Sequence, residues 1–197
     1  MSLKEDINYS LWCDFIERDF LENRFQEIIA DKTIQGATSN PAIFESAISN
    51  SVAYKQQLDM LQANNAKTIY EELALTDIKR AAALLDDLHK NDADDGFISI
   101  EVDPLLCDDA QGTIEEGIRL NSLIGADNVM IKVPATEAGY IAMRELTSKG
   151  IHVNATLIFS PEQAIKCAQA LDEGIKESNK DIKAVISVFV SRLDRLA

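Results

Sequence analysis

The chain has little cysteine, little histidine and no long run of apolar residues, and each shortage excludes a class of protein. Its three cysteines, Cys13, Cys107 and Cys167, form no Cys-x-x-Cys pair, and only two histidines are present. A disulfide framework and a zinc site are therefore poorly supported, and we expect three buried thiols. The longest apolar stretch, around Val188–Val190, is far shorter than the ~18 residues that a membrane span needs.

Positive charge is also scarce, since 19 lysines and arginines stand against 33 aspartates and glutamates in 197 residues, a net charge of −14. A chain this acidic repels polyanions, and no basic run offsets the repulsion. We therefore expect no binding to nucleic acid or to a membrane surface. The N-terminus lacks the apolar core of a signal peptide, which predicts a cytoplasmic protein. The composition is compatible with a monomer or a homodimer.

Short apolar runs alternate with longer amphipathic stretches. The clearest amphipathic stretch, about Lys67 to Lys90, repeats apolar residues at helical spacing and predicts a helix. Ser160-Pro161-Glu162-Gln163 has the pattern of an N-cap, a proline at the first helical position and a capping-box glutamine, and predicts another helix start. Six runs predict strands: Ser10–Cys13, Ile34–Ala37, Phe97–Val102, Val129–Val133, Val153–Leu157 and Val185–Val190.

Strands that alternate with helices predict a parallel sheet, either open or closed into a barrel. Polar residues at alternate strand positions favour the barrel, because they would point into its lumen. At roughly 33 residues per βα unit, a (β/α)8 TIM-type barrel needs about 260 residues. We therefore expect residues 1–197 to form a single α/β barrel domain that covers about the first six βα units and is incomplete at its C-terminus. The polar residues assigned to the lumen include Glu101, Lys132, Asn154, Thr156 and Ser187.

Lys132 interrupts an apolar strand near its C-terminal end, where barrel enzymes carry their catalytic groups. Burial disfavours the ammonium form of a lysine, and a free amine can attack a carbonyl to form a Schiff base. The alternative is a structural lysine that reaches solvent from the strand end or pairs with Glu101.

The polar residues on the neighbouring strands have two interpretations each. Glu101, Asn154 and Thr156 would flank Lys132 and could supply the proton transfers of Schiff-base chemistry. Alternatively, Glu101 caps the following helix, and Asn154 and Thr156 are core residues with satisfied hydrogen bonds.

Asp14 and Asn40, which follow the first two predicted strands, also have two interpretations each. Asp14 is either a second carboxylate near the mouth of the barrel or a turn residue. Asn40 either caps the helix begun by Pro41 or binds a sugar hydroxyl.

Six motifs in order along the whole chain resemble the transaldolase family. Gly36-Ala37-Thr38-Ser39-Asn40-Pro41 and the later Ile131-Lys132-Val133-Pro134-Ala135-Thr136-x-x-Gly139 resemble the paired signatures of that family. The other four are Trp12-Cys13-Asp14, Ile100-Glu101-Val102-Asp103, Asn154-x-Thr156-Leu157-x-Phe159-Ser160 and Ser187-Val188-Phe189-Val190-Ser191-Arg192.

The resemblance implies a barrel enzyme of the pentose phosphate pathway with no cofactor and no metal. Such enzymes transfer dihydroxyacetone through a Schiff base from sedoheptulose 7-phosphate to glyceraldehyde 3-phosphate, giving erythrose 4-phosphate and fructose 6-phosphate. By motif, Lys132 is the nucleophile, Asp14 is the base in carbon–carbon cleavage, and Glu101 and Thr156 transfer protons through a water. The implied substrate-binding residues are Thr38, Asn40, Asn154, Ser187, Phe189 and, for a phosphate, Arg192.

Short members of the same family act as aldolases that release free dihydroxyacetone. They carry the lysine nearer the N-terminus and a tyrosine where this chain has Phe189, and both differences favour transfer here. A second hypothesis is a catalytically silent sugar-phosphate-binding module, and a third is a barrel fragment without a site of its own. The partners we expect are small sugar phosphates and the chain's own missing C-terminal segment.

Overall fold

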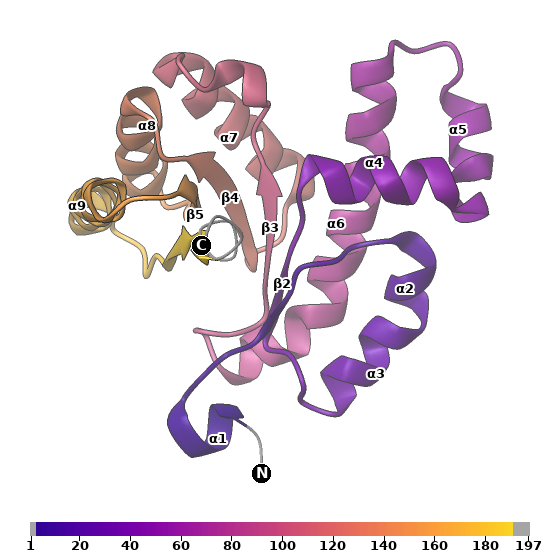
Figure 1. Ribbon diagram of the computed structural model, residues 1–197, viewed down its shortest axis with the longest axis horizontal. Helices are drawn as coiled ribbons and strands as arrows, with labels where there is room; N and C mark the ends of the chain where they lie inside the picture. Colours follow the sequence, from indigo (N-terminus) through magenta and orange to yellow (C-terminus); the bar gives the residue numbers. More distant parts are fainter. Residues whose placement is uncertain (1–2, 191–197) are drawn as a thin grey trace. The chain divides into compact units, whose positions relative to one another are not determined.

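The computed structural model describes residues 3–190, in which helices and strands alternate (Figure 1). The chain divides into two compact units. Unit 1 comprises residues 1–100 and 126–129, and unit 2 comprises residues 101–125 and those from 130 onward.

All six predicted strands are present, and their order in the sheet, β1-β2-β3-β4-β5-β6, is their order along the chain. The pairs β1–β2, β2–β3, β4–β5 and β5–β6 are parallel. A doubly wound sheet reverses its strand order at a switch point, whereas a barrel does not. The chain therefore has the α/β fold of a (β/α)8 TIM-type barrel over six strands, as expected from the sequence.

Unit 1 contains the strands β1 (Trp12–Cys13), β2 (Gly36–Thr38) and β3 (Phe97–Glu101), and the last residue of β3 belongs to unit 2. Gly36 faces Trp12 in the register, and a Cβ on this glycine would lie 2.7 Å from the indole ring. Only glycine therefore fits beside the tryptophan. The helices of this unit are α1 (Leu3–Ile7), α2 (Arg18–Glu22), α3 (Arg24–Ala30), α4 (Pro41–Asn50), the 3-10 helix η1 (Val52–Tyr54), α5 (Lys55–Leu61) and α6 (Ala66–Asn91).

Helix α6 is the helix predicted from Lys67 to Lys90. It begins where the side chain of Asn65 accepts a hydrogen bond of 3.0 Å from the Thr68 N–H. Leu73, Ile78 and Leu85 of its apolar stripe are fully buried, and Ile69 and Leu88 near its two ends are half-buried, which confirms the helical spacing read from the sequence.

Asn128 ties the start of β4 to unit 1. Its side-chain amide is 3% exposed and donates to the carbonyl oxygens of Ala82 at 2.9 Å and Gly96 at 2.8 Å. Its own carbonyl oxygen accepts the N–H of Ile98 at 3.0 Å. Residues 126–129 therefore belong to the first unit, although 25 residues of the second unit, 101–125, precede them in the chain.

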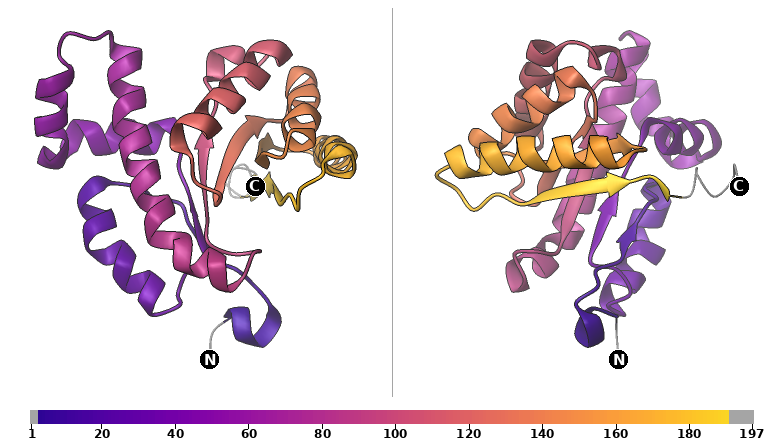
Figure 2. Two further views of the ribbon diagram at one scale, coloured as in Figure 1. Left: turned by 180° about the vertical axis from the view of Figure 1, so that it is seen from behind. Right: turned by 60° about the vertical axis from the view of Figure 1, so that its left-hand side comes forward.

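In unit 2, helix α9 lies along β5 and β6 (Figure 2). Helices α8 and α9 approach closely at Gly174, where a Cβ would lie 2.0 Å from the hydroxyl of Thr147. The elements of this unit are η2 (Pro104–Leu106), α7 (Ala110–Ile124), β4 (Val129–Pro134, from its second residue), α8 (Glu137–Ser148), β5 (His152–Ile158), α9 (Pro161–Glu177) and β6 (Ala184–Val188).

Strand β5 contains a bulge that breaks the predicted alternation. Its register with β6 shifts between Ala155 and Ile158, and Leu157 adopts a left-handed φ of 57°. Leu157 is 37% exposed, whereas Ile158 is fully buried. The strict alternation of lumen-facing polar residues with apolar residues therefore fails at Leu157, because the bulge inserts an extra residue and shifts the alternation by one position.

Two further expectations concern burial. Cys167 is fully buried, but Cys13 and Cys107 are only half-buried, so the prediction of three buried thiols is wrong for two of them. Both half-buried cysteines lie at the ends of elements, β1 and η2, where fewer residues pack around the chain.

Within residues 3–190, no helix combines the length and the apolar character needed to span a membrane.

Candidate active site

Lys132 lies in β4 with only 6% of its surface exposed, and both of its neighbours in the strand, Ile131 and Val133, are fully buried. It faces Asn154 of β5 in the register, and its carbonyl oxygen accepts the N–H of Val102 at 3.2 Å. This burial is incompatible with a lysine that reaches solvent from the strand end. Because successive side chains of a strand point to opposite faces, the lysine side chain lies on the other face of β4 from these two apolar residues.

Thr156 lies two residues beyond Asn154 and pairs with Pro134 in the register. Its side chain is fully buried, and its hydroxyl has no hydrogen-bond partner among the described residues. Leaving such a group unpaired costs about 1 to 3 kcal/mol, so this hydroxyl is not the satisfied core residue considered above. A buried polar group of this kind is characteristic of a site that receives a ligand or a water.

Asn154 and Ser187 contact each other directly. The Ser187 hydroxyl donates a hydrogen bond of 2.8 Å to the Asn154 side-chain oxygen, and Asn154 is 2% exposed. The structure therefore brings together two of the predicted substrate-binding residues, from β5 and β6.

Phe159 and Phe189 form an aromatic pair just beyond the ends of β5 and β6. Their ring centroids lie 5.4 Å apart with the planes tilted by 47°. The main chain joins the two strand ends as well, because the Phe189 N–H donates to the carbonyl oxygen of Ile158 at 2.9 Å. Phe159 was not predicted as a site residue, and its only signal in the sequence was its place in the Asn154-x-Thr156 motif.

Gln163, in the first turn of α9, connects the loops that follow β4 and β5. Its side-chain oxygen accepts the N–H of Phe159 at 2.9 Å, and its amide group donates to the carbonyl oxygen of Ala135 at 3.1 Å. The Ser160 hydroxyl accepts the Gln163 N–H at 3.2 Å, which confirms the predicted N-cap. The prediction of a capping-box glutamine is wrong, because the Gln163 side chain accepts the N–H of Phe159 and not that of the N-cap residue. It instead holds the loops after β4 and β5 together.

Glu101 ends β3 and is half-buried. The helix cap that was its alternative role belongs to Asp103, whose carboxylate accepts the Leu105 N–H at 2.9 Å at the start of η2. Glu101 therefore does not serve as that cap.

Three predicted site residues belong to unit 1 and follow its first two strands. Asp14 is exposed in the loop between β1 and α2, and Thr38 ends β2 half-buried. The side-chain oxygen of Asn40 accepts the Ile43 N–H at 3.0 Å, which confirms Asn40 as the N-cap of α4.

Burial raises the pKa of the Cys13 thiol, next to Asp14 in the sequence, and the Asp14 carboxylate adds to the effect. Arg192, the predicted phosphate ligand, lies outside the described residues. Among residues 3–190, no group of three or more histidine, cysteine or acidic side chains is arranged to hold a metal ion.

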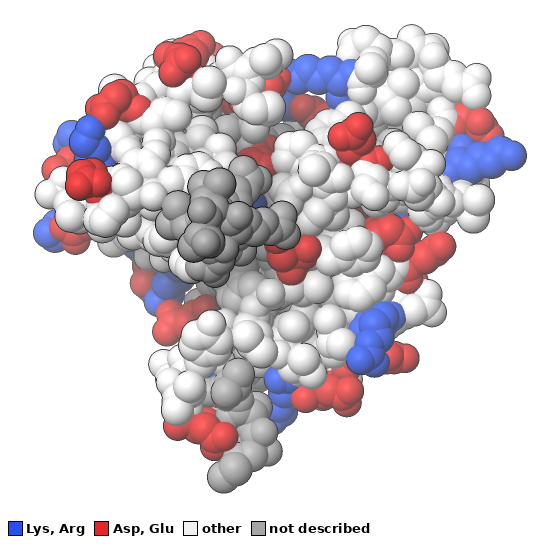
Figure 3. Space-filling view, viewed as in Figure 1, with Lys and Arg blue, Asp and Glu red and all other residues white. Residues whose placement is uncertain are grey.

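Charged side chains are dispersed on the face drawn in Figure 3, where lysines and arginines lie singly or beside carboxylates. Several cations among the described residues are in ion pairs, such as Lys166 with Glu137 at 2.5 Å and Lys176 with Asp172 at 2.6 Å. The described part of this face has no continuous basic patch.

Comparison with known proteins agrees with the motifs. A family model described as "Transaldolase/Fructose-6-phosphate aldolase" matches residues 11–197. The chain belongs to this family.

Several family members that are named transaldolase are similar to this chain. A transaldolase from Campylobacter jejuni subsp. doylei is 52% identical over 96% of this chain. A transaldolase from Helicobacter pylori strain Shi470 is 52% identical over 95% of the chain, and one from strain HPAG1 is 49% identical over the same share. The chain spans 61% of the length of the Campylobacter protein and 58% of that of the Helicobacter proteins.

Proposed function

We propose that this protein is a transaldolase that transfers a dihydroxyacetone unit from sedoheptulose 7-phosphate to glyceraldehyde 3-phosphate, with erythrose 4-phosphate and fructose 6-phosphate as products. The observation that carries the proposal is the burial of Lys132 in β4, opposite Asn154 and near the unpaired hydroxyl of Thr156. We place the reaction in the cytoplasm, in a monomer or homodimer, with small sugar phosphates as the only ligands.

In the first step the neutral amine of Lys132 attacks the ketose carbonyl carbon to give a carbinolamine. Loss of water from this intermediate leaves a protonated imine, which draws electrons from the adjacent carbon–carbon bond. A proton must reach the departing hydroxyl, and Glu101 with Thr156 would deliver it through a bound water. The buried hydroxyl of Thr156 supports this role because it is available to hydrogen-bond such a water.

In the second step Asp14 takes the proton of the C4 hydroxyl as the bond between C3 and C4 breaks. The electrons of that bond flow into the imine, which becomes an enamine, and erythrose 4-phosphate leaves as the free aldehyde. In the reverse sense the enamine attacks the aldehyde of glyceraldehyde 3-phosphate, and Asp14 returns the proton to the new hydroxyl. Hydrolysis of the imine then releases fructose 6-phosphate.

Residues that donate and accept hydrogen bonds would hold the dihydroxyacetone unit. Asn154 and Ser187 would contact its hydroxyls, with Thr38 and Asn40 from unit 1 serving the same purpose. Arg192 would hold a phosphate group, since its planar guanidinium pairs with two phosphate oxygens and stays charged.

We attribute the transfer of the dihydroxyacetone unit, in place of its release, to the apolar side chain of Phe189. If a water or an acidic side chain protonates the enamine carbon, the dihydroxyacetone unit can no longer be transferred and is released. Phe189 and its partner Phe159 have no proton to give and exclude water from the surface that they cover. We therefore propose a transferase and not an aldolase.

The test is borohydride trapping with fructose 6-phosphate in the full-length protein. Reduction of the imine should add a stable three-carbon or six-carbon unit to Lys132, located by peptide mass spectrometry. Lys132→Ala should neither trap the sugar nor transfer dihydroxyacetone, whereas Lys149→Ala, which replaces an exposed lysine of unit 2 paired with Glu145, should do both. An untrapped wild type together with an active Lys132→Ala would refute the proposal.

A further inference from the structure

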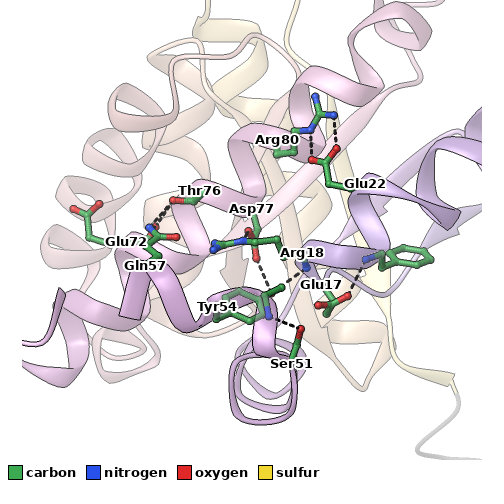
Figure 4. A network of polar contacts seen from close by, with 12 residues as sticks. Glu17, Arg18, Glu22, Ser51, Tyr54, Gln57, Glu72, Thr76, Asp77 and Arg80 are labelled. Atoms are coloured by element: carbon green, nitrogen blue, oxygen red, sulfur yellow. Dashed lines mark hydrogen bonds and ion pairs between the residues drawn. The ribbon is translucent and has the colours of Figure 1, made fainter. Parts of the chain in front are cut away.

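The loop between β1 and α2 carries Asp14 and ends in a buried polar cluster of Arg18, Tyr54 and Asp77, all in unit 1 (Figure 4). Asp77 lies on α6 and is 1% exposed. One of its carboxylate oxygens accepts a hydrogen bond from the Arg18 side chain at 2.9 Å, and the other accepts the Tyr54 hydroxyl at 2.7 Å. The cluster thus joins α2, η1 and α6 around one carboxylate.

Tyr54 also holds the main chain of the loop. It is fully buried, and its hydroxyl oxygen accepts the main-chain N–H of Arg18 at 3.2 Å while its proton goes to Asp77. The Arg18 guanidinium lies over the tyrosine ring, 4.5 Å from its centroid. Side chain and main chain of Arg18 are therefore both fixed by the same tyrosine and carboxylate.

The cluster is expensive to bury, so stability alone is a weak explanation for it. Burial raises the pKa of Asp77 and of Tyr54, which means that desolvation opposes their charged forms. One carboxylate oxygen of Glu17 and one terminal nitrogen of Arg18 are buried without a hydrogen-bond partner among the described residues. Buried ion pairs often contribute little net stability, and their best-supported benefit is a defined geometry.

The cluster fixes the conformation of the β1–α2 loop, which carries Asp14. Its start is fixed by the pairing of Cys13 with Ala37 in the sheet, and its middle by Ile16, which is fully buried. Its end is fixed at Arg18, four positions after Asp14. Asp14 itself is exposed, so nothing described around its own side chain limits how far it can move.

We propose that Tyr54 and Asp77 are positioning residues for Asp14, acting by holding the end of the β1–α2 loop through Arg18. The inference rests on the proposed function, in which Asp14 takes the proton during carbon–carbon cleavage. It predicts that the cluster serves the cleavage step and not the formation of the imine at Lys132.

These two steps can be measured separately in the full-length protein. Imine formation is followed by borohydride trapping with dihydroxyacetone, which needs no carbon–carbon cleavage. Cleavage is followed by the single-turnover release of erythrose 4-phosphate from sedoheptulose 7-phosphate. In Tyr54→Phe, trapping should stay within about twofold of the wild type, whereas cleavage should slow about 10- to 100-fold, because displacing a catalytic group by about 1 Å costs this much.

Arg80 supplies a matched control, also drawn in Figure 4. It joins the same two helices, α6 and α2, through two hydrogen bonds of 2.6 and 2.7 Å to Glu22, but on the exposed surface and away from the Arg18 main chain. Arg80→Gln should leave both steps unchanged. If Arg80→Gln slows cleavage as much as Tyr54→Phe does, general helix packing is responsible and the inference is wrong.

Circular dichroism establishes that each variant is folded before its kinetics are compared. Should Tyr54→Phe not fold, Asp77→Asn serves instead, because it keeps the volume of the side chain while weakening its hold on Arg18 and Tyr54. Selective loss of cleavage in either variant supports the inference, and a normal cleavage rate in a folded variant overturns it. A wild type that traps no imine would instead contradict the proposed function.

Discussion

The hydroxyl of Ser187 donates its hydrogen bond to the side-chain oxygen of Asn154, across the pair of strands β5 and β6. Asn154 is nearly inaccessible to solvent and faces Lys132 in the register. The serine therefore helps to orient an amide on the strand next to Lys132, and under the proposed function the contact would link substrate binding on β6 to the nucleophile on β4.

We predict that Ser187→Ala lowers kcat/KM for sedoheptulose 7-phosphate by about tenfold. The variant removes a hydrogen bond to a buried side chain, and such a bond contributes about 0.5 to 1.5 kcal/mol. Ser187→Thr keeps the hydroxyl and should retain most of the activity. Steady-state kinetics of the two variants check the prediction, and equal losses in both would show that the hydrogen bond is unimportant.

Lys132→Met should abolish transfer but keep or raise stability, by about 1 kcal/mol in the free energy of unfolding. The change removes a buried amine whose desolvation opposes folding and puts an apolar side chain of similar length in its place, and stability often rises when a functional polar group is removed in this way. Urea denaturation measures the effect. A loss of more than about 2 kcal/mol would mean that Lys132 is half of a stabilising ion pair, the alternative considered from the sequence.

Leu157 offers a test of the bulge in β5. Because a left-handed φ is costly for β-branched residues, we expect Leu157→Val to lower the free energy of unfolding by about 1 to 3 kcal/mol. Leu157→Gly relieves the backbone and should stay within about 1 kcal/mol of the wild type. The valine variant should also lose activity, since it disturbs the backbone next to Thr156. Denaturation curves that rank the two variants in the opposite order would contradict this account.

Cys167 should make the protein less stable at high pH. Burial raises the pKa of its thiol from its ordinary value near 9 to about 11. Below pH 9 both the folded and the unfolded chain keep the proton, but between about pH 9 and 11 only the unfolded chain loses it. The free energy of unfolding should therefore fall as the pH rises through this window, by up to about 2 to 3 kcal/mol.

The measurement for Cys167 compares urea denaturation of the wild type and Cys167→Ala at pH 8 and at pH 10.5. Contributions from other groups are shared by both proteins, so the difference between them isolates the thiol. An identical loss of stability in both proteins would assign the pH dependence to other residues.

Phe159→Ala should increase the release of free dihydroxyacetone relative to transfer. Without the Phe159 ring, one face of Phe189 loses its cover, and water gains access to the enamine. The ratio of dihydroxyacetone to fructose 6-phosphate formed from sedoheptulose 7-phosphate and glyceraldehyde 3-phosphate measures the effect. Phe159→Leu retains apolar bulk and serves as the control, and an unchanged ratio in Phe159→Ala would exclude a role for the pair in keeping water out.

Much of the fold was predictable because its signals are local. Apolar runs marked all six strands, and Asn40 and Ser160 marked their helix starts, since a side chain that caps a helix acts within three residues. The position of Lys132 in a buried strand was predictable for the same reason. The contact of Asn154 with Ser187 followed only in outline, from their presence on neighbouring strands.

Other features had no local signal. A leucine is among the residues least expected at a left-handed φ, so nothing in the sequence indicated the bulge at Leu157. The cluster of Arg18, Tyr54 and Asp77 is assembled from residues 23 to 59 positions apart and matches no motif. Such contacts depend on how helices pack, which one-dimensional patterns do not report.

The bonds from Asn128 to Ala82 and Gly96 have a consequence for synthesis of the chain. The ribosome makes residues 101–125, which belong to unit 2, before it makes the four residues that complete unit 1. Unit 1 therefore cannot reach its final form as an independent N-terminal domain on the nascent chain.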